Sequence, residues 1–447
     1  MEPRYETADA AAIRALQLER LRTLLAAAWQ TNDFYRAHWR ATGVTDVGEI
    51  DSLAAFAARI PTVGKADFLA DQQADPPFGR RHAHARAQGV ALYVSTTSGT
   101  SGQGQEVHVQ TQREWDAMSR VYCYLHRWAG LAAGDGLALA MPLTMMGGGR
   151  LEYHGAQAYG LSVYPIGNDD AARKIETIRR FQPAGVMGIT AYLGRLANAL
   201  GGEPAPGVRT ILTGGEGAGV AWLRRLEGAW RARVFDRYGS SQAGNDHMFT
   251  CEHGIGTAER PGVMHNIDPD VLLEVVDPDT GRHVAAGEVG ELIVTILYRT
   301  DAPMIRCWMG DRAVYRPAGS CPCGRPFGGV EVASIGRADD MRKIKGVNVW
   351  PQAVDDVVFE QVAVADYQVV LSSGSGGNDI ATLRAMPKAA LDAEDGAVLA
   401  RALGGAVERR IGIRVDVELV EPGALAQSDW KARRWIDRRE HVIGGAA

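Results

Sequence analysis

The spacing of hydrophobic and polar positions changes along the chain, and each change indicates a different kind of structure. Between residues 9 and 44, apolar side chains recur every three or four positions with arginines between them, as in AAIRALQLERLRTLLAAAW. This period predicts helices. Either Thr31 or Asn32 is a candidate cap for the helix in TNDFYRAHWRATGV.

From about residue 90 onward, short apolar runs alternate with helical segments. The runs are GLALAMPL, LSVYPIG, AGVMGIT, VRTILTGGE and ARVFDRYGSS, and the segments between them include DDAARKIETIRRF and AYLGRLANAL. Strands that alternate with helices predict βαβ units and a largely parallel sheet.

Two later regions have patterns of their own. Residues 270–315 contain β-rich runs (DVLLEVVD, GELIVTIL, RAVYR) separated by turn residues, which predicts an antiparallel subdomain. After GRADD, the order of runs predicts a small α+β unit, with SSGSGGND at 372–379 as a hairpin loop. We therefore expect an α/β protein with a large domain over residues 1–338, built of parallel sheets plus the β-rich subdomain, and a small, mobile α+β domain over 339–447.

Composition excludes several classes of protein. The 447 residues are 46% hydrophobic and 23% charged, which is ordinary for folded domains, and the net charge of -5 provides no broad basic face for nucleic acid or anionic lipid. There is no apolar run of membrane-spanning length, and MEPRYETADA has no apolar signal core. The sequence predicts a soluble, cytoplasmic protein with no nucleic-acid or membrane partner.

Four soft ligands fall in two tight pairs. Cys251 and His253 lie two positions apart, as do Cys321 and Cys323, and three thiolates with one imidazole make the closed shell typical of structural zinc. The alternative is two pairs of ordinary polar loop residues. The other two cysteines, Cys123 and Cys307, are expected in or near the core.

Glycine and hydroxyl residues gather at turns that follow predicted strands. VSTTSGTSGQGQEVHV at 94–109 is either a phosphate-binding loop or a flexible hairpin connection, and the stretch alone does not separate the two. TGGEG, DRYGSSQAGN, RCWMGDRA and GRADD follow other runs, where ligands bind in open α/β sheets. Tyr238 could offer a ring face to a flat heterocycle and Asp311 could accept from ribose hydroxyls, although YG and GD pairs are also common turn formers.

Read together, TTSGTSGQG, RYGSSQ, GDRA, GRADDMRKIKGVNVWPQAVDD and SDWKARRWIDRR resemble the adenylate-forming superfamily, and more narrowly the phenylacetate-CoA ligases. The similarity extends over nearly the whole chain. The two ligand pairs, Cys251 with His253 and Cys321 with Cys323, also resemble a zinc site of this branch. Such enzymes activate a carboxylic acid with ATP and Mg²⁺ as an acyl-adenylate, then transfer the acyl group to a thiol, usually that of coenzyme A. Relatives are often dimers, which makes a homodimer our expectation.

The resemblance implies roles for individual residues. Lys431 is the mobile lysine that bridges the acid and the α-phosphate, and Asp339 is the pivot about which the small domain rotates. Tyr238 stacks on adenine, Asp311 holds the ribose hydroxyls, and Arg337 assists from the hinge. The full set assigned to ATP is Ser98, Gly99, Thr100, Ser101, Gly102, Gly214, Gly215, Glu216, Tyr238, Gly239, Ser240, Ser241, Gln242, Asp311 and Arg337.

The chain departs from the family pattern at two places. The phosphate loop lacks its lysine, with Gln103 and Gln105 instead, and Gln242 occupies the position of a magnesium-binding glutamate. A neutral amide can coordinate a cation through its carbonyl oxygen but adds no charge. Glu216 or another carboxylate could supply the missing ligand.

The segment MPLTMMGGGRLEYHGAQAYG falls where the family has the wall of its acid pocket. Its soft methionines and glycines suggest an aryl or arylacetic acid, unless the methionines simply pack in the core. The pocket residues are Met145, Met146, Gly147 and Gly148. The leading function is an acid–thiol ligase. The alternatives are an adenylating enzyme with another acceptor or substrate (AMP transfer to a phenol, amide formation, nitrite-dependent diazotisation), and a non-catalytic nucleotide-binding scaffold.

Overall fold

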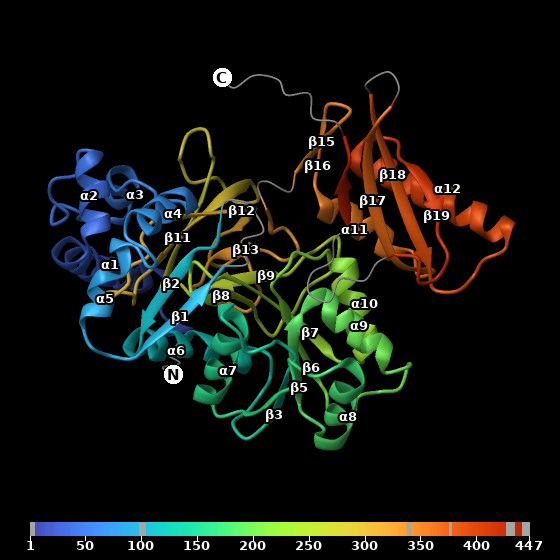
Figure 1. Ribbon diagram of the computed structural model, residues 1–447, viewed down its shortest axis with the longest axis horizontal. Helices are drawn as coiled ribbons and strands as arrows, with labels where there is room; N and C mark the ends of the chain where they lie inside the picture. The colour runs from blue at the N-terminus through green and yellow to red at the C-terminus, as the bar shows by residue number, and fades with distance from the viewer. Residues whose placement is uncertain (1–4, 98–103, 338–340, 375–377, 426–433, 440–447) are drawn as a thin grey trace.

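The computed structural model describes residues 5–97, 104–337, 341–374, 378–425 and 434–439. Most of these residues form a large body around one twelve-stranded sheet, and those from 341 onward form a smaller α+β unit beside α9 and α10 (Figure 1). This architecture confirms the predicted fold class. None of the helices in the described ranges combines the length and the apolar composition needed to cross a membrane.

The chain begins with helices, as the apolar period predicts. Asn32, rather than Thr31, caps the second helix: its side chain accepts a hydrogen bond from the backbone N–H of Tyr35 at 3.1 Å. Tyr35 and Trp39 on that helix are fully buried. The helical elements of this region are α1 (Ala10–Thr31), α2 (Asp33–Ala41), α3 (Leu53–Arg59), α4 (Lys65–Ala74), η2 (Arg80–His82) and α5 (Ala83–Ala87).

Five strands of the large sheet are parallel, in the spatial order β7-β6-β5-β3-β4. Every residue of β5 and β6 is buried, because helices cover both faces of the sheet there. The strands are β3 (Gly136–Leu139), β4 (Ser162–Pro165), β5 (Gly185–Ile189), β6 (Thr210–Gly214) and β7 (Arg233–Ser240). The helices around them are α6 (Gln112–Trp128), α7 (Gly147–Tyr159), α8 (Ala171–Phe181), α9 (Thr190–Ala199) and α10 (Val220–Trp230).

The same sheet continues with antiparallel strands, which include the β-rich region predicted for 270–315. They are β8 (Asn245–Thr250), β9 (Val263–Asn266), β10 (Val271–Val276), β11 (Val289–Ile296), β12 (Cys307–Arg316), β13 (Gly329–Glu331) and β14 (Gly336–Arg337). A separate antiparallel pair, β1 (Leu92–Thr96) and β2 (Val107–Thr111), flanks the glycine-rich stretch.

The smaller unit has a core of its own, which includes Val358, Leu383 and Leu403. Its main sheet has the order β19-β18-β17-β20, and β15 pairs with β16. Its elements are β15 (Arg342–Ile344), β16 (Val347–Val349), α11 (Pro351–Glu360), β17 (Val364–Ser373), β18 (Asp379–Pro387), α12 (Ala393–Ile411), β19 (Asp416–Leu419) and β20 (Trp435–Asp437). It contacts the large body through Phe359, whose ring lies 4.4 Å from that of Trp222 on α10.

Candidate functional site

A cavity of about 940 Å³ lies at the carboxyl ends of the parallel strands, where the smaller unit meets the large body. The large body contributes the ends of β5, β6 and β7 together with parts of β12 and β14. The smaller unit contributes Arg342, Gln352, Asp355, Arg434 and Trp435. This is the edge at which ligands bind in open α/β sheets.

Most of the residues predicted to bind ATP, as far as they are described, line this cavity. They are Gly215, Glu216, Tyr238, Gly239, Ser240, Ser241, Gln242, Asp311 and Arg337. Gly214, the last residue of β6, packs beside it: a Cβ atom there would lie 2.5 Å from the carbonyl oxygen of Arg237. Seven predicted site residues lie outside the described residues: Ser98, Gly99, Thr100, Ser101, Gly102, the predicted hinge residue Asp339 and the predicted catalytic Lys431.

Tyr238, Asp311 and Arg337 converge on one wall. Asp311 and Arg337 are opposed in the antiparallel pairing of β12 and β14, and the guanidinium Nε lies 3.9 Å from Asp311 Oδ1. The Tyr238 hydroxyl donates to Asp311 Oδ2 at 2.7 Å. Burial, with the Asp311 charge second, raises the pKa of Tyr238 well above its ordinary value, so the hydroxyl keeps its proton.

Glu106 is a cavity residue that the sequence did not single out. It immediately precedes β2, is only 1% exposed, and accepts hydrogen bonds from Gln242 Nε2 at 2.9 and 3.2 Å. Burial alone raises the pKa of its carboxyl. The His108 imidazole, whose Nε2 lies 3.7 Å from Glu106 Oε2, the hydrogen bonds from Gln242 and the charge of Arg81 together outweigh burial, so the pKa lies below its ordinary value and the group is ionised at neutral pH.

The acid-pocket residues divide into two pairs. Met146 and Gly148 line the cavity. Met145 and Gly147 are not among its lining residues, and Met145 is 51% exposed because its side chain lies on the surface before α7. Of the four positions predicted to form the acid pocket, Met146 and Gly148 therefore line the cavity, as do Met141 and Leu151.

A buried ionic cluster lies at the end of the cavity next to Met146 and Leu151. The Arg237 guanidinium contacts the carboxylates of Asp246 and, at 2.6 Å, of Glu152. Glu152 is 1% exposed, and burial raises the pKa of its carboxyl, an effect that Arg237 opposes. Burial also raises the pKa of the neighbouring Asp236 to about 7. The end of the pocket next to Met146 and Leu151 thus combines apolar walls with charged groups.

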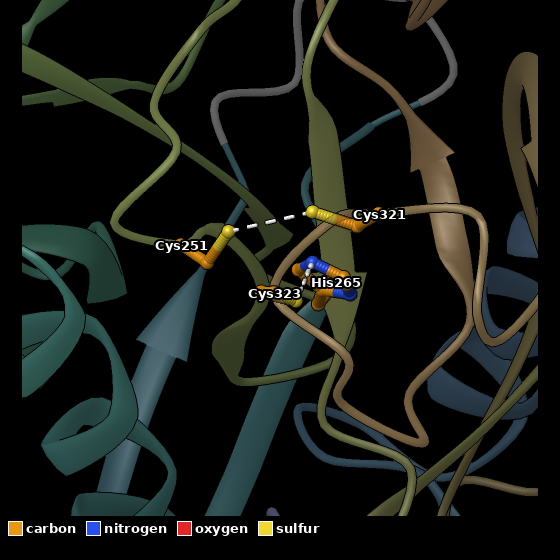
Figure 2. Close-up of side chains that lie close together, drawn as sticks. All are labelled: Cys251, His265, Cys321 and Cys323. Carbon is orange, nitrogen blue, oxygen red and sulfur yellow. Dashed lines mark hydrogen bonds between the residues drawn. The ribbon is translucent and has the colours of Figure 1, made fainter.

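A second cluster of side chains brings three cysteines and a histidine together (Figure 2). The ligand atoms of Cys251, His265, Cys321 and Cys323 all lie within 4.8 Å of one another. Cys251 Sγ and Cys321 Sγ are 3.7 Å apart, and Cys323 Sγ lies 3.4 Å from His265 Nε2. Around a tetrahedral Zn²⁺ with usual bond lengths, two sulfur ligands lie about 3.8 Å apart, and a sulfur and a nitrogen ligand lie about 3.6 Å apart. The four side chains therefore fit such an ion.

The backbone around His265 orients its ring. Its Nδ1 lies 3.1 Å from the carbonyl oxygen of Phe327, so this nitrogen donates and Nε2 faces the cysteines. His265 is 1% exposed on β9, beside β13, which follows the Cys321–Cys323 loop.

The predicted histidine ligand is wrong. His253 is exposed and is not in the cluster, whereas the three predicted cysteines are. The physical reason is local: residues 251–254 form a tight turn closed by a bond from the Gly254 N–H to the Cys251 carbonyl at 2.8 Å, and the His253 side chain leaves that turn toward solvent. Close spacing favoured His253 in the sequence, although the histidine that lies among the three cysteines is His265 on the intervening strand β9.

Comparison with known proteins agrees with the geometry. A family model described as AMP-binding enzyme matches residues 30–296, and one described as AMP-binding enzyme C-terminal domain matches residues 346–439. Phenylacetate-coenzyme A ligase of Thermus thermophilus is 28% identical over 463 residues, covering 98% of this chain and 99% of that protein. The enzyme of the same name from Escherichia coli (strain K12) is 28% identical over 451 residues and covers 98% of both chains.

Among solved structures, 2-hydroxyisobutyryl-CoA ligase in the postadenylation state, in complex with 2-HIB-AMP, has a TM-score of 0.87, 27% identity, and coverage of 97% of this chain and 91% of that chain. In the thioesterification state, with 2-HIB-AMP and CoA, it scores 0.67 with 27% identity and coverage of 98% and 92%. The structure of this chain is therefore more similar to the first of these two structures than to the second. These matches confirm the resemblance predicted from the motifs: the chain belongs to the family of AMP-binding enzymes.

Proposed function

We propose that this protein activates an aryl or arylacetic acid with ATP as an acyl-adenylate and then transfers the acyl group to coenzyme A. The observation that carries the proposal is the single cavity in which Tyr238, Asp311 and Arg337 converge beside the Gly215–Glu216 turn. Near-full-length similarity to phenylacetate-coenzyme A ligases supports it.

The cavity residues suit a nucleotide. Asp311 is 13% exposed at its side chain and can accept from two ribose hydroxyls, while the Tyr238 hydroxyl bond holds its carboxylate in place. The ring of Tyr238 presents a face for adenine. Backbone N–H groups and hydroxyls of the loop around Ser98–Gly102 would bind the phosphates, a role that stays a prediction from the motif.

Activation consists of attack by the acid oxygen on the α-phosphate, with pyrophosphate leaving on the opposite side. Because two anions meet in this step, cationic groups lower its barrier by electrostatic stabilisation. Lys431, from the motif SDWKARR, is the residue we propose to bridge the acid and the α-phosphate. Mg²⁺, when bound, neutralises charge on the phosphates during this attack.

The acid would enter beside Met146, Gly148 and Leu151, with its carboxylate toward the nucleotide. Apolar walls of this kind suit an aromatic ring, because methionine and leucine side chains gain free energy by covering it. The charged cluster of Arg237 and Glu152 at this end favours a ring with a polar substituent over an unsubstituted one.

A second acceptor is favoured by one specific observation, the replacement of the usual glutamate by Gln242. An enzyme with altered phosphate contacts could transfer the acyl group to an amine with release of AMP, could transfer AMP to a phenol, or could activate nitrite. Measuring pyrophosphate and AMP release with ATP and a panel of aryl acids, with and without coenzyme A, separates these functions. We expect acid-dependent pyrophosphate release, and faster AMP release when coenzyme A is present. AMP release that does not change with coenzyme A but increases when an amine is added would contradict a thiol as the acceptor.

The Cys251, His265, Cys321 and Cys323 cluster is proposed to hold structural Zn²⁺, since four protein ligands leave no open position for catalysis. A homodimer and a cytoplasmic location stay predictions. Light scattering coupled to size-exclusion chromatography tests the first.

A further inference from the structure

The missing carboxylate at position 242 has a counterpart across the cavity. We propose that Glu106 supplies the magnesium-binding carboxylate of this enzyme, and that Gln242 positions it. This rests on the proposed function, because the cation in question is the one that accompanies ATP. The resemblance implies a glutamate at position 242 in related enzymes. In this chain, Glu106 would supply the negative charge and Gln242 would hold that carboxylate in place.

The contact between the two side chains is direct. Gln242 Nε2 donates to both carboxylate oxygens of Glu106, at 2.9 Å to Oε1 and 3.2 Å to Oε2. The carboxylate therefore lies within one hydrogen bond of the place where the family carries its own. A carboxylate has about four acceptor directions. Gln242 takes two of them and His108 Nε2, 3.7 Å from Oε2, faces a third, which leaves at least one for a cation.

Glu106 is fixed at the base of the predicted phosphate loop. Its backbone N–H donates to Thr97 Oγ1 at 3.0 Å, and its carbonyl accepts from the Thr97 N–H at 3.0 Å. Thr97 and Glu106 therefore flank the stretch predicted to wrap the β- and γ-phosphates. A carboxylate fixed at this point lies beside that predicted phosphate site, and hard oxygen ligands of this kind are those that Mg²⁺ prefers.

The other carboxylates of the cavity wall have other contacts. Glu216 Oε1, the alternative ligand from the sequence, accepts from the Ala191 N–H at 2.6 Å near the start of α9. Asp311 accepts from Tyr238 on the ribose side. The remaining four described carboxylates of the wall also have partners of their own. Arg237 contacts Glu152 and Asp246, and its backbone N–H donates to Asp236, while Tyr367 and Arg434 contact Asp355.

Exchanging the two side chains gives a sharp test. Glu106→Gln removes the charge, and the double variant Glu106→Gln/Gln242→Glu restores a carboxylate–amide pair at the same contact with the charge on the other residue. The readout is the affinity of Mn²⁺ for the complex with α,β-methylene-ATP, measured by electron paramagnetic resonance, because this nucleotide cannot release pyrophosphate.

We expect Glu106→Gln to weaken Mn²⁺ binding by about tenfold, since one negative ligand is lost, and the exchanged pair to recover most of that loss. Melting temperatures without metal should be similar in the wild type and the exchanged pair. Wild-type Mn²⁺ affinity in Glu106→Gln would overturn the assignment. Failure of the exchanged pair to recover any affinity would also overturn it.

The single variant Gln242→Glu tests the same contact without removing Glu106. Two carboxylates at this distance repel each other until a cation binds between them, so we expect a lower melting temperature without metal and tighter Mn²⁺ binding. Unchanged values for both would contradict the proposal. A separate titration of the wild type with AMP in the absence of metal isolates the proposed function: no binding there would contradict nucleotide binding itself, whereas AMP binding with unaltered Mn²⁺ affinity in the variants would contradict only the role of Glu106.

Discussion

The Tyr238 hydroxyl donates a hydrogen bond of 2.7 Å to Asp311 Oδ2, which ties the residue proposed to stack on adenine to the residue proposed to hold the ribose. The two side chains come from β7 and β12, strands that are separated by 73 positions in the sequence at this contact. The bond therefore fixes the two side chains relative to each other in the proposed nucleoside site.

Removing only this bond should weaken nucleotide binding without disturbing the ring. In Tyr238→Phe we expect the KM for ATP to rise at least about tenfold, equivalent to about 1.5 kcal/mol for a lost hydrogen bond to a charged group. Steady-state kinetics at saturating acid measure this change. Tyr164→Phe is the matched control, because the Tyr164 ring packs on Phe181 and does not line the cavity, and a similar effect there would contradict the role of the Tyr238 bond.

Lys431→Ala should abolish adenylation while leaving the melting temperature unchanged. A lost cation at the reacting phosphate costs at least about a hundredfold in rate when it stabilises transition-state charge. Acid-dependent exchange of pyrophosphate into ATP measures the half-reaction alone. Full exchange activity in this variant would show that another group bridges the acid and the α-phosphate.

The metal prediction can be tested on two histidines, the buried His265 in the cluster and the exposed His253 outside it. The wild type should contain about one zinc per chain, and His265→Ala should lose it and unfold at a lower temperature, because a tetrahedral site with three ligands is weaker. His253→Ala, with its exposed side chain, should retain both the zinc and the melting temperature. Elemental analysis and thermal melts check this, and zinc loss in His253→Ala alone would contradict the cluster seen in Figure 2.

Acid sensitivity should depend on His126 in α6. This side chain is fully buried between the rings of Tyr122 and Tyr159, and neither nitrogen has a hydrogen-bond partner among the described residues. Burial, with the charge of Arg237 second, lowers the pKa of His126 to about 3. Below the ordinary pKa of about 6.5, His126 therefore binds a proton in the unfolded chain but not in the folded chain. The free energy of unfolding consequently falls as the pH falls.

In His126→Phe this contribution is absent, so its loss of unfolding free energy between pH 7.5 and pH 5 should be smaller than in the wild type by about 2 kcal/mol. Urea titrations at the two pH values measure the difference. The other buried histidines contribute equally to both proteins. An identical loss in both would mean that His126 binds its proton in the folded state as readily as in the unfolded chain.

Local signals in the sequence predicted much of the fold. The apolar runs that became β5 and β6 depend on neighbours a few residues away. The same holds for the helix cap, for which the sequence offered Thr31 or Asn32, and for the glycine-rich stretch, for which a hairpin connection was one of two alternatives. The cavity residues with motif character, such as Tyr238 and Asp311, were also found, because the resemblance supplies their positions.

Residues that work through distant partners were missed. His265 joins cysteines that lie 14 positions before it and 58 after it, and Glu106 contacts Gln242 across 136 positions. The same reasoning applies to the ionic cluster of Arg237 and Glu152, because charged residues in a sequence give no sign of burial. For His265, one signal was present: it lies on an apolar strand, VMHN, where a polar side chain that points into the core needs a partner.

The central claim is that side chains from separate strands converge on one adenylate, and calorimetric titration with a non-hydrolysable arylacetyl-adenylate mimic tests it most directly. We predict one site per chain in the wild type, with affinity at least about tenfold weaker in Asp311→Ala, because the ribose hydroxyls lose a charged acceptor. Absence of heat and of thermal protection in the wild type, or equal affinity in both proteins, would contradict the account.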